Sequence, residues 1–228
     1  MSKLKNREDM IYHVLRNAIF NTDLPPGIQL IESSLADSFG VSRTPIRTVL
    51  QRLKYESLVE IIPKRGAFVY CPSPKEAEQI FFVRQVLEPE AAALASKFVT
   101  ENQLQEMKGY LQKEEECYKK NMPEKALPVI EKFHMVIIEA SGNPYLVESL
   151  RKIISLSHII LTFYDVSENH CYDVLKEHTA IYNAIANGEE EEAKRMAYLH
   201  IPSIVKDIDF SKQFNTSLSI SQIITKYM

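Results

Sequence analysis

The fold of the N-terminal third is decided by one stretch, Gly40-Val41-Ser42-Arg43-Thr44-Pro45-Ile46-Arg47. Ser42 is a favourable N-cap residue, and Pro45 falls in the first turn of the helix that follows, where its missing N–H costs little. This helix is expected to run to Glu56 and to bury one apolar stripe, formed by Ile46, Val49, Leu50 and Leu53. Arg43 and Arg47 are four residues apart and share the opposite face. The stretch therefore predicts a helix with two arginines in its N-terminal turns.

The residues before this stretch predict two more helices. Residues 7–20 have apolar side chains at the i, i+3/i+4 spacing of an amphipathic helix, which Leu24-Pro25-Pro26-Gly27 ends. Residues 28–31 are expected to form a short extended piece. A second helix is expected to begin at Ser33 or Ser34 as its N-cap, with Gly40 just beyond its end.

The residues after the stretch predict a β-hairpin. Residues 59–62 and 67–70 are short β-prone runs, and Pro63-Lys64-Arg65-Gly66 between them is a turn sequence. The order helix, helix, tight turn, helix and two-stranded wing predicts a winged helix-turn-helix domain over residues 1–74, with a linker at about 71–74.

Such a domain predicts DNA binding through the third helix and the wing. A recognition helix enters the major groove with its N-terminal residues foremost. Arg43 and Arg47 can pair with guanine or phosphate, and Ser42 and Thr44 can bind phosphates. Lys64 and Arg65 at the wing tip can reach the minor groove or the backbone. The alternative is a solvated basic face with a capping serine.

Charge is divided unevenly between the two parts of the chain. The 228 residues have a net charge of −3. Residues 1–74 contain 10 Lys and Arg and 7 Asp and Glu, whereas residues 75–228 contain 17 and 23. This division fits a small nucleic-acid-binding module attached to an acidic body. No apolar run approaches the ~20 residues of a membrane span, and no secretory signal is expected. The three cysteines lack metal-type spacing, which favours a reducing cytoplasm.

The second part of the chain is predicted to be an all-helical bundle. Helical patterns cover about 75–99, 101–120, 124–141, 145–164, 173–187 and 189–206. Pro89, Pro128 and Pro202 lie within these stretches and are expected to kink or split the helices. The tail, residues 210–228, stays unassigned within a second domain of residues 75–228. The fold class is therefore mainly α, a winged helix-turn-helix domain followed by a helical bundle.

The first domain resembles the N-terminal domain of the GntR family of bacterial transcription regulators. The resemblance covers nearly all of residues 7–70 and rests on Pro26-Gly27, Leu35-Ala36, residues 40–47, Leu50, Leu53 and residues 64–69. It implies DNA contacts from Arg43, Thr44, Arg47 and the wing around Gly66. The family often has an arginine after the glutamate of the second helix, where this chain has Ser33 after Glu32.

The second domain is similar to the FadR-type C-terminal domain, FCD, in its six-helix, VanR-like version. The similarity covers most of residues 80–201 and rests on residues 83–92, Phe133-His134, residues 140–144, Glu177-His178 and the positions around His200. It implies a homodimer, an effector cavity inside the bundle and often a divalent metal.

Three histidines are the candidate metal ligands. His134, His178 and His200 each lie on the apolar face of a predicted helix, so they can converge in the core. Neutral imidazoles suit a divalent metal such as Zn or Ni and would leave coordination positions open. The alternative is three separate core histidines, each with its own hydrogen bond.

The chain departs from the FCD pattern beside this candidate site. The family's aspartate ligand lies four residues before the histidine of Phe-His, and Ile130 occupies that position here. Glu131 follows it and could reach the site only with a local helix adjustment. The predicted ligands are therefore three histidines, with Glu131 as a further candidate.

Arg84 is the candidate effector-binding residue, because it lies among apolar positions of the first bundle helix. A buried arginine needs an anion. The resemblance suggests that the anion is the carboxylate of a small organic acid; the alternative is an ion pair with Glu88.

Three functions are compatible with these patterns. The favoured one is a ligand-responsive, dimeric DNA-binding regulator, a repressor released by a small carboxylate effector. The second is a metal-dependent, hydrolase-like enzyme, in which Glu131 would be the sole nearby base. The third is a helical adaptor, which leaves the basic N-terminal turn of the third helix unexplained.

Overall fold

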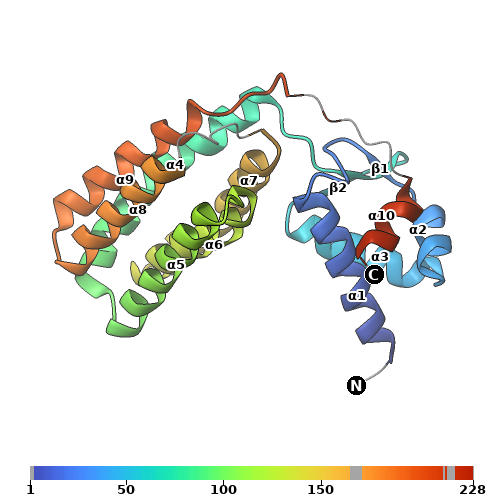
Figure 1. Ribbon diagram of the computed structural model, residues 1–228, viewed down its shortest axis with the longest axis horizontal. Helices are drawn as coiled ribbons and strands as arrows, with labels where there is room; N and C mark the ends of the chain where they lie inside the picture. Colours follow the sequence, from blue (N-terminus) through green and yellow to red (C-terminus); the bar gives the residue numbers. More distant parts are fainter. Residues whose placement is uncertain (1–2, 165–170, 213, 215–218, 228) are drawn as a thin grey trace. The chain divides into compact units, whose positions relative to one another are not determined.

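The computed structural model describes residues 3–164, 171–212, 214 and 219–227, which divide into two compact units. The first unit contains Met1–Pro72 together with Ser211–Met228, and the second contains Ser73–Phe210. Both are mainly helical, which confirms the predicted fold class (Figure 1).

The first unit is a winged helix-turn-helix domain. Its helices are α1 (Lys3–Phe20), α2 (Glu32–Phe39) and α3 (Arg43–Tyr55), and its strands are β1 (Gln29–Leu30), β2 (Val59–Ile62) and β3 (Gly66–Val69). The strands form an antiparallel sheet in the order β1-β3-β2, with Gln29 opposite Phe68 and Glu60 opposite the same residue. The predicted two-stranded wing therefore gains a third strand from the extended piece before α2.

The stripe predicted for α3 is confirmed, whereas the predicted start of α2 is wrong. Ile46, Val49, Leu50 and Leu53 are buried in the core of the first unit. Helix α2 begins at Glu32 with Ile31 as its N-cap, not at Ser33 or Ser34. Ile31 leaves β1 in an extended conformation, and its carbonyl already accepts a hydrogen bond from the Leu35 N–H. The strand thus sets where the helix starts.

The second unit is a bundle of α4 (Pro74–Phe98), α5 (Glu101–Lys119), α6 (Leu127–Ala140), α7 (Pro144–Tyr164), α8 (Cys171–Ala186) and α9 (Glu190–Val205). Its largest buried cluster draws side chains from α4, α5, α6, α8 and α9, including Met107, Phe133 and Ile181. The core therefore holds together the helices that carry the candidate site.

The three prolines act differently from one another. Pro128 lies in the first turn of α6, after the short 3₁₀ helix η1 (Pro123–Lys125), so the chain is split there as predicted. Helices α4 and α9 continue through Pro89 and Pro202, so of the two predicted outcomes, a kink or a split, neither helix is split there. These two helices pack against each other along their length, and this packing holds both of them helical through the missing hydrogen bonds.

The tail belongs to the first unit, which corrects its assignment to residues 75–228. Helix α10 (Ile220–Tyr227) packs against α1 and α2 and buries Ile223 and Ile224. The unit boundary after Pro72 falls within the predicted linker. The apolar spacing of α10 is only two turns long and lies among serine and threonine residues, so its helical pattern was too short to recognise.

Candidate functional site

The first candidate site is the N-terminal turn of α3. Ser42 is the N-cap, as predicted, but its side chain makes no capping hydrogen bond. Ser42, Arg43 and Thr44 are all exposed. The first N–H groups of a helix lack partners inside the helix and point along its positive end. Because no side chain caps them here, they are available to a phosphate, with the hydroxyls of Ser42 and Thr44 beside them.

Arg47 is held by the second helix of the motif. Its Nε donates to the Glu32 carboxylate at 2.8 Å, although the Arg47 side chain is still 63% exposed. The pair fixes the stem of the guanidinium on the outer face of α3. Glu32 therefore positions Arg47 through a contact with Nε, and the exposed guanidinium has further N–H groups that can donate hydrogen bonds.

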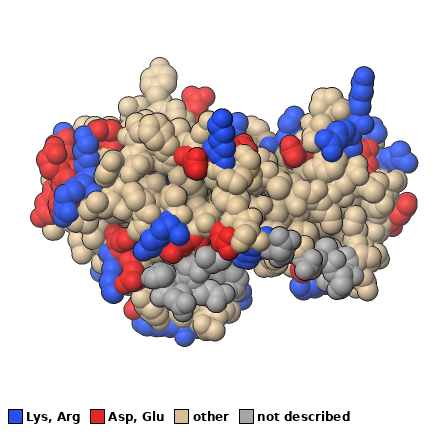
Figure 2. Space-filling view, turned by 90° about the horizontal axis from the view of Figure 1, so that it is seen from above, with Lys and Arg blue, Asp and Glu red and all other residues tan. Residues whose placement is uncertain are grey.

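The wing tip is a tight basic turn. Lys64 and Gly66 have φ angles of 64° and 104°, and a Cβ atom on Gly66 would lie 3.3 Å from the Gln29 amide nitrogen. That amide donates to the Arg65 carbonyl at 2.8 Å. Lys64 and Arg65 are exposed, and Lys and Arg side chains project from the surface of the first unit in Figure 2. The turn favours glycine because Gly66 has a positive φ, and because a Cβ atom there would crowd the Gln29 side chain.

The second candidate site is a cluster of three buried histidines. His134 from α6, His178 from α8 and His200 from α9 each offer one ligand atom, and these atoms all lie within 4.8 Å of one another. The Nε2 atoms of His178 and His200 are 3.2 Å apart. None of the three side chains is more than 5% exposed. The structure thus brings together the three predicted metal ligands.

Each of these imidazoles faces a different glutamate through its Nδ1 atom. Nδ1 lies 2.9 Å from Glu88 for His134, 2.9 Å from Glu114 for His178 and 2.8 Å from Glu177 for His200. A carboxylate only accepts hydrogen bonds, so the proton of each neutral ring belongs on Nδ1. Each Nε2 then carries a lone pair. Carboxylate–histidine pairs of this kind fix the tautomer of histidines that bind metals.

The Nε2 lone pairs lie close together and suit a cation. The Nε2 of His134 has no hydrogen-bond partner in the part of the chain that the structure describes. The Nε2 atoms of His178 and His200 face each other, and in this tautomer neither has a proton to donate. Three neutral imidazoles are a suitable donor set for a divalent transition metal. The residues present therefore fit such an ion.

Burial and neighbouring charges set the ionisation of the cluster. Burial lowers the pKa of His134, and it lowers the pKa of His200 further, well below the usual value, with His178 and His134 adding to the effect. Burial alone would raise the pKa of Glu88, but Arg84 and His134 lower it to about 2. Burial raises the pKa of Glu177. The imidazoles of His134 and His200 are thus held neutral, the form that binds metal.

Glu131 does not join the histidine cluster. Its carboxylate contacts Nδ1 of His158 and accepts a hydrogen bond from Ser155 at 3.2 Å. It lies three residues before His134 on α6, a spacing that leaves it directed at α7 instead. Ile130 offers no ligand atom. Among the described residues, the candidate ligands are therefore the three histidines.

Arg84 is engaged inside the protein. Its guanidinium contacts both oxygens of Glu88, and its NH1 group donates to the Ser157 hydroxyl at 3.1 Å. This is the ion pair that the sequence left open as the alternative to an effector contact. Because Glu88 also accepts from His134, one carboxylate joins the arginine to the histidine cluster.

The space beside the cluster is small. A cavity of about 10 Å³ is lined by Glu88, Ala92, His134, Ile137, Ile138, Ile181, Ala197 and His200. That volume is about one water molecule. In this closed state the cavity accommodates an ion or a water, whereas an organic acid needs the helices to separate.

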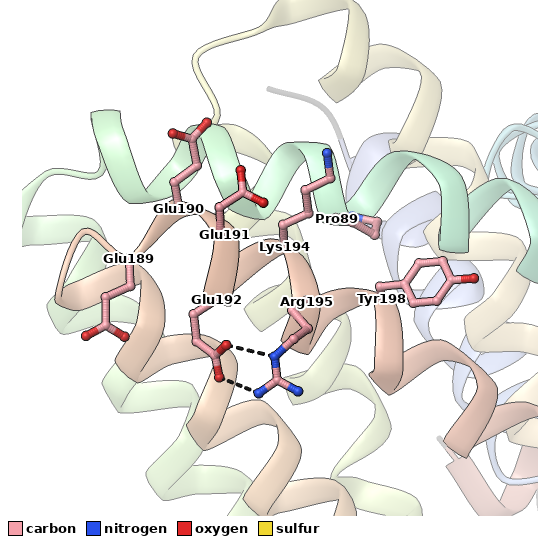
Figure 3. Close-up of a pocket in the computed structure, with 8 residues that line it drawn as sticks. All are labelled: Pro89, Glu189, Glu190, Glu191, Glu192, Lys194, Arg195 and Tyr198. Atoms are coloured by element: carbon pink, nitrogen blue, oxygen red, sulfur yellow. Dashed lines mark hydrogen bonds and ion pairs between the residues drawn. The ribbon is translucent and has the colours of Figure 1, made fainter.

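A larger hollow of about 900 Å³ lies on the surface of the second unit, between α4 and the first half of α9 (Figure 3). Two of the four glutamates that line it have basic partners, Glu192 with Arg195 and Glu190 with Lys97, and Lys194 pairs with Glu90. None of the three histidines lines it. It is an open, polar surface, distinct from the buried cluster.

One functional residue escaped the sequence analysis altogether. Glu114 is 1% exposed on α5 and holds His178 in place. It lies three residues after Leu111 and seven after Met107, on the same buried stripe. A charged residue on an apolar stripe was the signal that could have found it.

The arrangement of the two units defines a class of protein. A winged helix-turn-helix domain with a basic recognition helix is joined to a helical bundle that encloses a buried polar site, as in transcription regulators that combine a DNA-binding and a sensing domain. Two family models match the chain: "FCD domain" over residues 79–202, and "Bacterial regulatory proteins, gntR family" over residues 7–69. The protein belongs to the GntR family of bacterial transcription regulators and carries an FCD domain, as its motifs predicted.

Individual relatives agree with this assignment. The chain is 26% identical to the HTH-type transcriptional regulator YdhC of Bacillus subtilis, over 83% of this chain and 85% of the relative. It is 23% identical to the HTH-type transcriptional repressor RspR of Escherichia coli, over 90% of each chain. The solved structure of E. coli McbR/YncC shares the fold with a TM-score of 0.70 at 21% identity, covering 90% of this chain and 96% of that one. Among the described residues, no helix has the length and apolarity to cross a membrane.

Proposed function

We propose that this protein is a homodimeric, cytoplasmic repressor whose affinity for a twofold DNA operator depends on a divalent cation held by three histidines. The observation that supports it best is the convergence of His134, His178 and His200 with their Nδ1 atoms on glutamates. RspR, a relative that spans nearly the whole chain, is a repressor by name.

DNA binding is assigned to the exposed residues of α3 and the wing. Ser42, Arg43 and Thr44 surround the uncapped N-terminus of α3, and Arg47 lies one turn further along, paired with Glu32. Lys64, Arg65 and Gly66 would follow the backbone beside the groove.

The cation would be held by His134, His178 and His200, with Glu88, Glu114 and Glu177 orienting the rings. Zn or Ni suits imidazole donors. When bound, the ion supplies a positive charge that ties α6, α8 and α9 together. Because Ile130 replaces a carboxylate ligand, positions on the ion would be left to water or to an effector.

A small carboxylate is the effector that Arg84 favours, and the structure sets the condition for it. The carboxylate has to displace Glu88 from Arg84 or open the cavity of about 10 Å³. The size of this cavity favours a second candidate, in which the metal ion itself is the signal. Titration of the metal-loaded protein with acetate and lactate separates the two candidates: a change in DNA affinity while the metal content stays constant supports the organic effector.

Dimerisation is assigned to the second unit. Helices α4 and α9 pack against each other and carry exposed large apolar side chains, among them Phe82, Val86, Tyr198 and Leu199. Exposed apolar residues on neighbouring helices favour a protein interface. Sedimentation of the full chain at micromolar concentration should give a dimer, and a monomer would contradict this assignment.

We further propose that the chain is not an enzyme. The hydrolase alternative needs a base beside the metal, and Glu131, its candidate, is directed to His158 and Ser155. The adaptor alternative leaves the basic end of α3 without a role.

The test is metal analysis combined with DNA binding. Wild type and His178→Ala are purified without chelator or affinity tag, and their zinc and nickel contents are measured. His13→Ala removes an exposed histidine and is the matched control. We expect about one ion per chain for wild type and the control, and a large loss for His178→Ala. A duplex selected by wild type from a random pool then reports DNA affinity with and without metal. Wild type that takes up no divalent ion would overturn the metal part of the proposal.

A further inference from the structure

Helix α10 lies outside both family matches, which end at residues 69 and 202, yet it is built into the DNA-binding unit. Its apolar residues are Ile220, Ile223, Ile224 and Tyr227, which share one face at the i, i+3, i+4, i+7 spacing. Ile223 and Ile224 are 1% and 2% exposed, because this face packs against α1 and α2 (Figure 1).

Specific polar contacts fix the last turn of α10 to the chain just after α1. Tyr227 donates to the Asp23 carboxylate and accepts a hydrogen bond from the Asn21 side chain at 2.9 Å. Lys226 pairs with Asp23 at 2.7 Å. Ser219 caps the other end and exchanges hydrogen bonds with Gln222. The helix thus has its own cap, an apolar face and a polar lock, so its position on the unit is specific.

The chain that leads to α10 starts beside the histidine cluster. His200 lies on α9, and Ser203, one turn later, donates to Glu177, the glutamate that orients His200. Beyond α9, the Asp209 N–H donates to the Tyr164 carbonyl at 2.8 Å, and Phe210 packs on the Tyr164 ring at 4.5 Å. The segment that follows α9 is therefore anchored to α7 at Asp209 and Phe210.

The DNA-binding unit is consequently joined to the bundle at two places in the sequence. One connection is residues 70–73, between β3 and α4, and the other is residues 206–219, between α9 and α10. Four residues span at most ~14 Å and fourteen at most ~50 Å. A domain joined to its neighbour by two segments has fewer accessible orientations than a domain joined by one. A dimer whose DNA-binding units have fewer orientations loses less entropy when both units bind one operator.

We propose that α10 is the docked end of a C-terminal tether through which α9, the helix that carries His200, acts on the DNA-binding unit. The effect of the tether on DNA affinity depends only on the docking of α10 on α1 and α2. The effect of metal on the tether rests on the proposed function above.

The experiment compares two pairs of charges on the same helix of the full-length chain. Ile223→Asp/Ile224→Asp places both charges on the buried face, and Ser221→Asp/Thr225→Asp places them on the exposed face as the matched control. In metal-free protein we expect the first variant to raise amide hydrogen exchange at least tenfold in residues 11–39 and to raise the Kd for the selected duplex about tenfold. The control should change each by less than about twofold.

A milder variant tests the same docking if the double substitution unfolds the DNA-binding unit. Tyr227→Phe retains the ring and removes the contacts with Asp23 and Asn21. We expect it to raise exchange in residues 11–39 and the Kd two- to fivefold while circular dichroism stays that of wild type. Exchange and Kd equal to those of wild type in Tyr227→Phe, or equal to those of the control in the double variant, would overturn the proposal.

A third measurement compares the Kd for the selected duplex with and without zinc. We expect the two values to differ at least fivefold in wild type, and their ratio to be close to one in Ile223→Asp/Ile224→Asp. An unchanged ratio in the variant would overturn the coupling. If wild type binds no zinc, the proposed metal function fails, and the metal-free comparison decides the docking by itself.

Discussion

The charged side chains of the two candidate sites differ in exposure: those of the first unit are exposed, and those of the second are mostly buried. In the first unit, Arg43, Lys64 and Arg65 extend into water, and the Arg47–Glu32 pair is largely solvated. In the second, Arg84, Glu88, Glu114 and three histidines are nearly inaccessible. A solvated charge costs the fold little, whereas a buried one is tolerated only with partners. Substitutions of these charged residues should therefore mainly change DNA binding in the first unit and stability in the second.

The largest expected effect is that of Arg84→Ala. Glu88 would stay buried beside His134 without its main cation, so the free energy of unfolding should fall by about 3–5 kcal/mol. Arg151→Ala, which removes an exposed pair with Glu139, is the matched control and should cost at most ~1 kcal/mol. Urea denaturation followed by circular dichroism measures both. Equal losses for the two variants would contradict the distinction between buried and solvated ion pairs.

Acid should destabilise the metal-free second unit in two steps. Burial lowers the pKa of His134 and of His200, so each stays neutral when folded and takes up a proton when unfolded at about pH 6.5. Stability is thus full above that pH and falls as the pH drops, by about 1.4 kcal/mol per pH unit for each group. The pKa of Glu88, lowered from 4.5 to about 2, adds a second loss between those values.

Urea denaturation between pH 7.5 and 5 measures the first step. His200→Ala should show a shallower slope, while His13→Ala, whose histidine is exposed, should keep the slope of wild type. A stability that stays constant over this range would contradict the buried, neutral state of these histidines.

Arg47→Ala should separate binding from folding. If Arg47 contacts a base, the affinity for the selected duplex should fall by about 1–3 kcal/mol. Stability should change by less than ~1 kcal/mol, because only a solvated pair with Glu32 is lost. Electrophoretic mobility shift and thermal melting measure the two quantities. Affinity equal to that of wild type, with the fold retained, would remove Arg47 from the DNA contacts.

The smallest expected effect is that of Lys64→Ala at the wing tip. A phosphate contact contributes about one released counterion, so the slope of log K against log salt should decrease by about one unit. Glu60→Gln lies on the same hairpin and serves as the control, since it removes a negative charge rather than a positive one. A slope unchanged from wild type would place the DNA away from the wing.

The sequence predicted those features that depend on local pattern. The stripe on α3, the hairpin and the histidine positions follow from periodicity within single elements, and all are found in the structure. The start of α2 was mispredicted because β1 fixes the backbone before Ser33, and strand pairing with β3 is not local.

The partners of the buried groups could not be predicted in the same way. The sequence offered Glu131 as a candidate beside His134, and Glu88 only as a partner of Arg84. Helix packing decides the partners instead: α4 brings Glu88 to His134, and α7 brings His158 to Glu131. The docking of α10 similarly depends on a surface formed by α1 and α2, about 200 positions earlier in the chain.

The charges around the histidine cluster would also set the valence of the ion that fits it. Glu88, Glu114 and Glu177 contribute three formal negative charges and Arg84 one positive charge, which leaves two formal negative charges. A divalent ion would make the whole assembly neutral, whereas a monovalent or trivalent ion would leave a net charge beside the core, where it is costly. Electroneutrality therefore favours a divalent ion over a monovalent or a trivalent one.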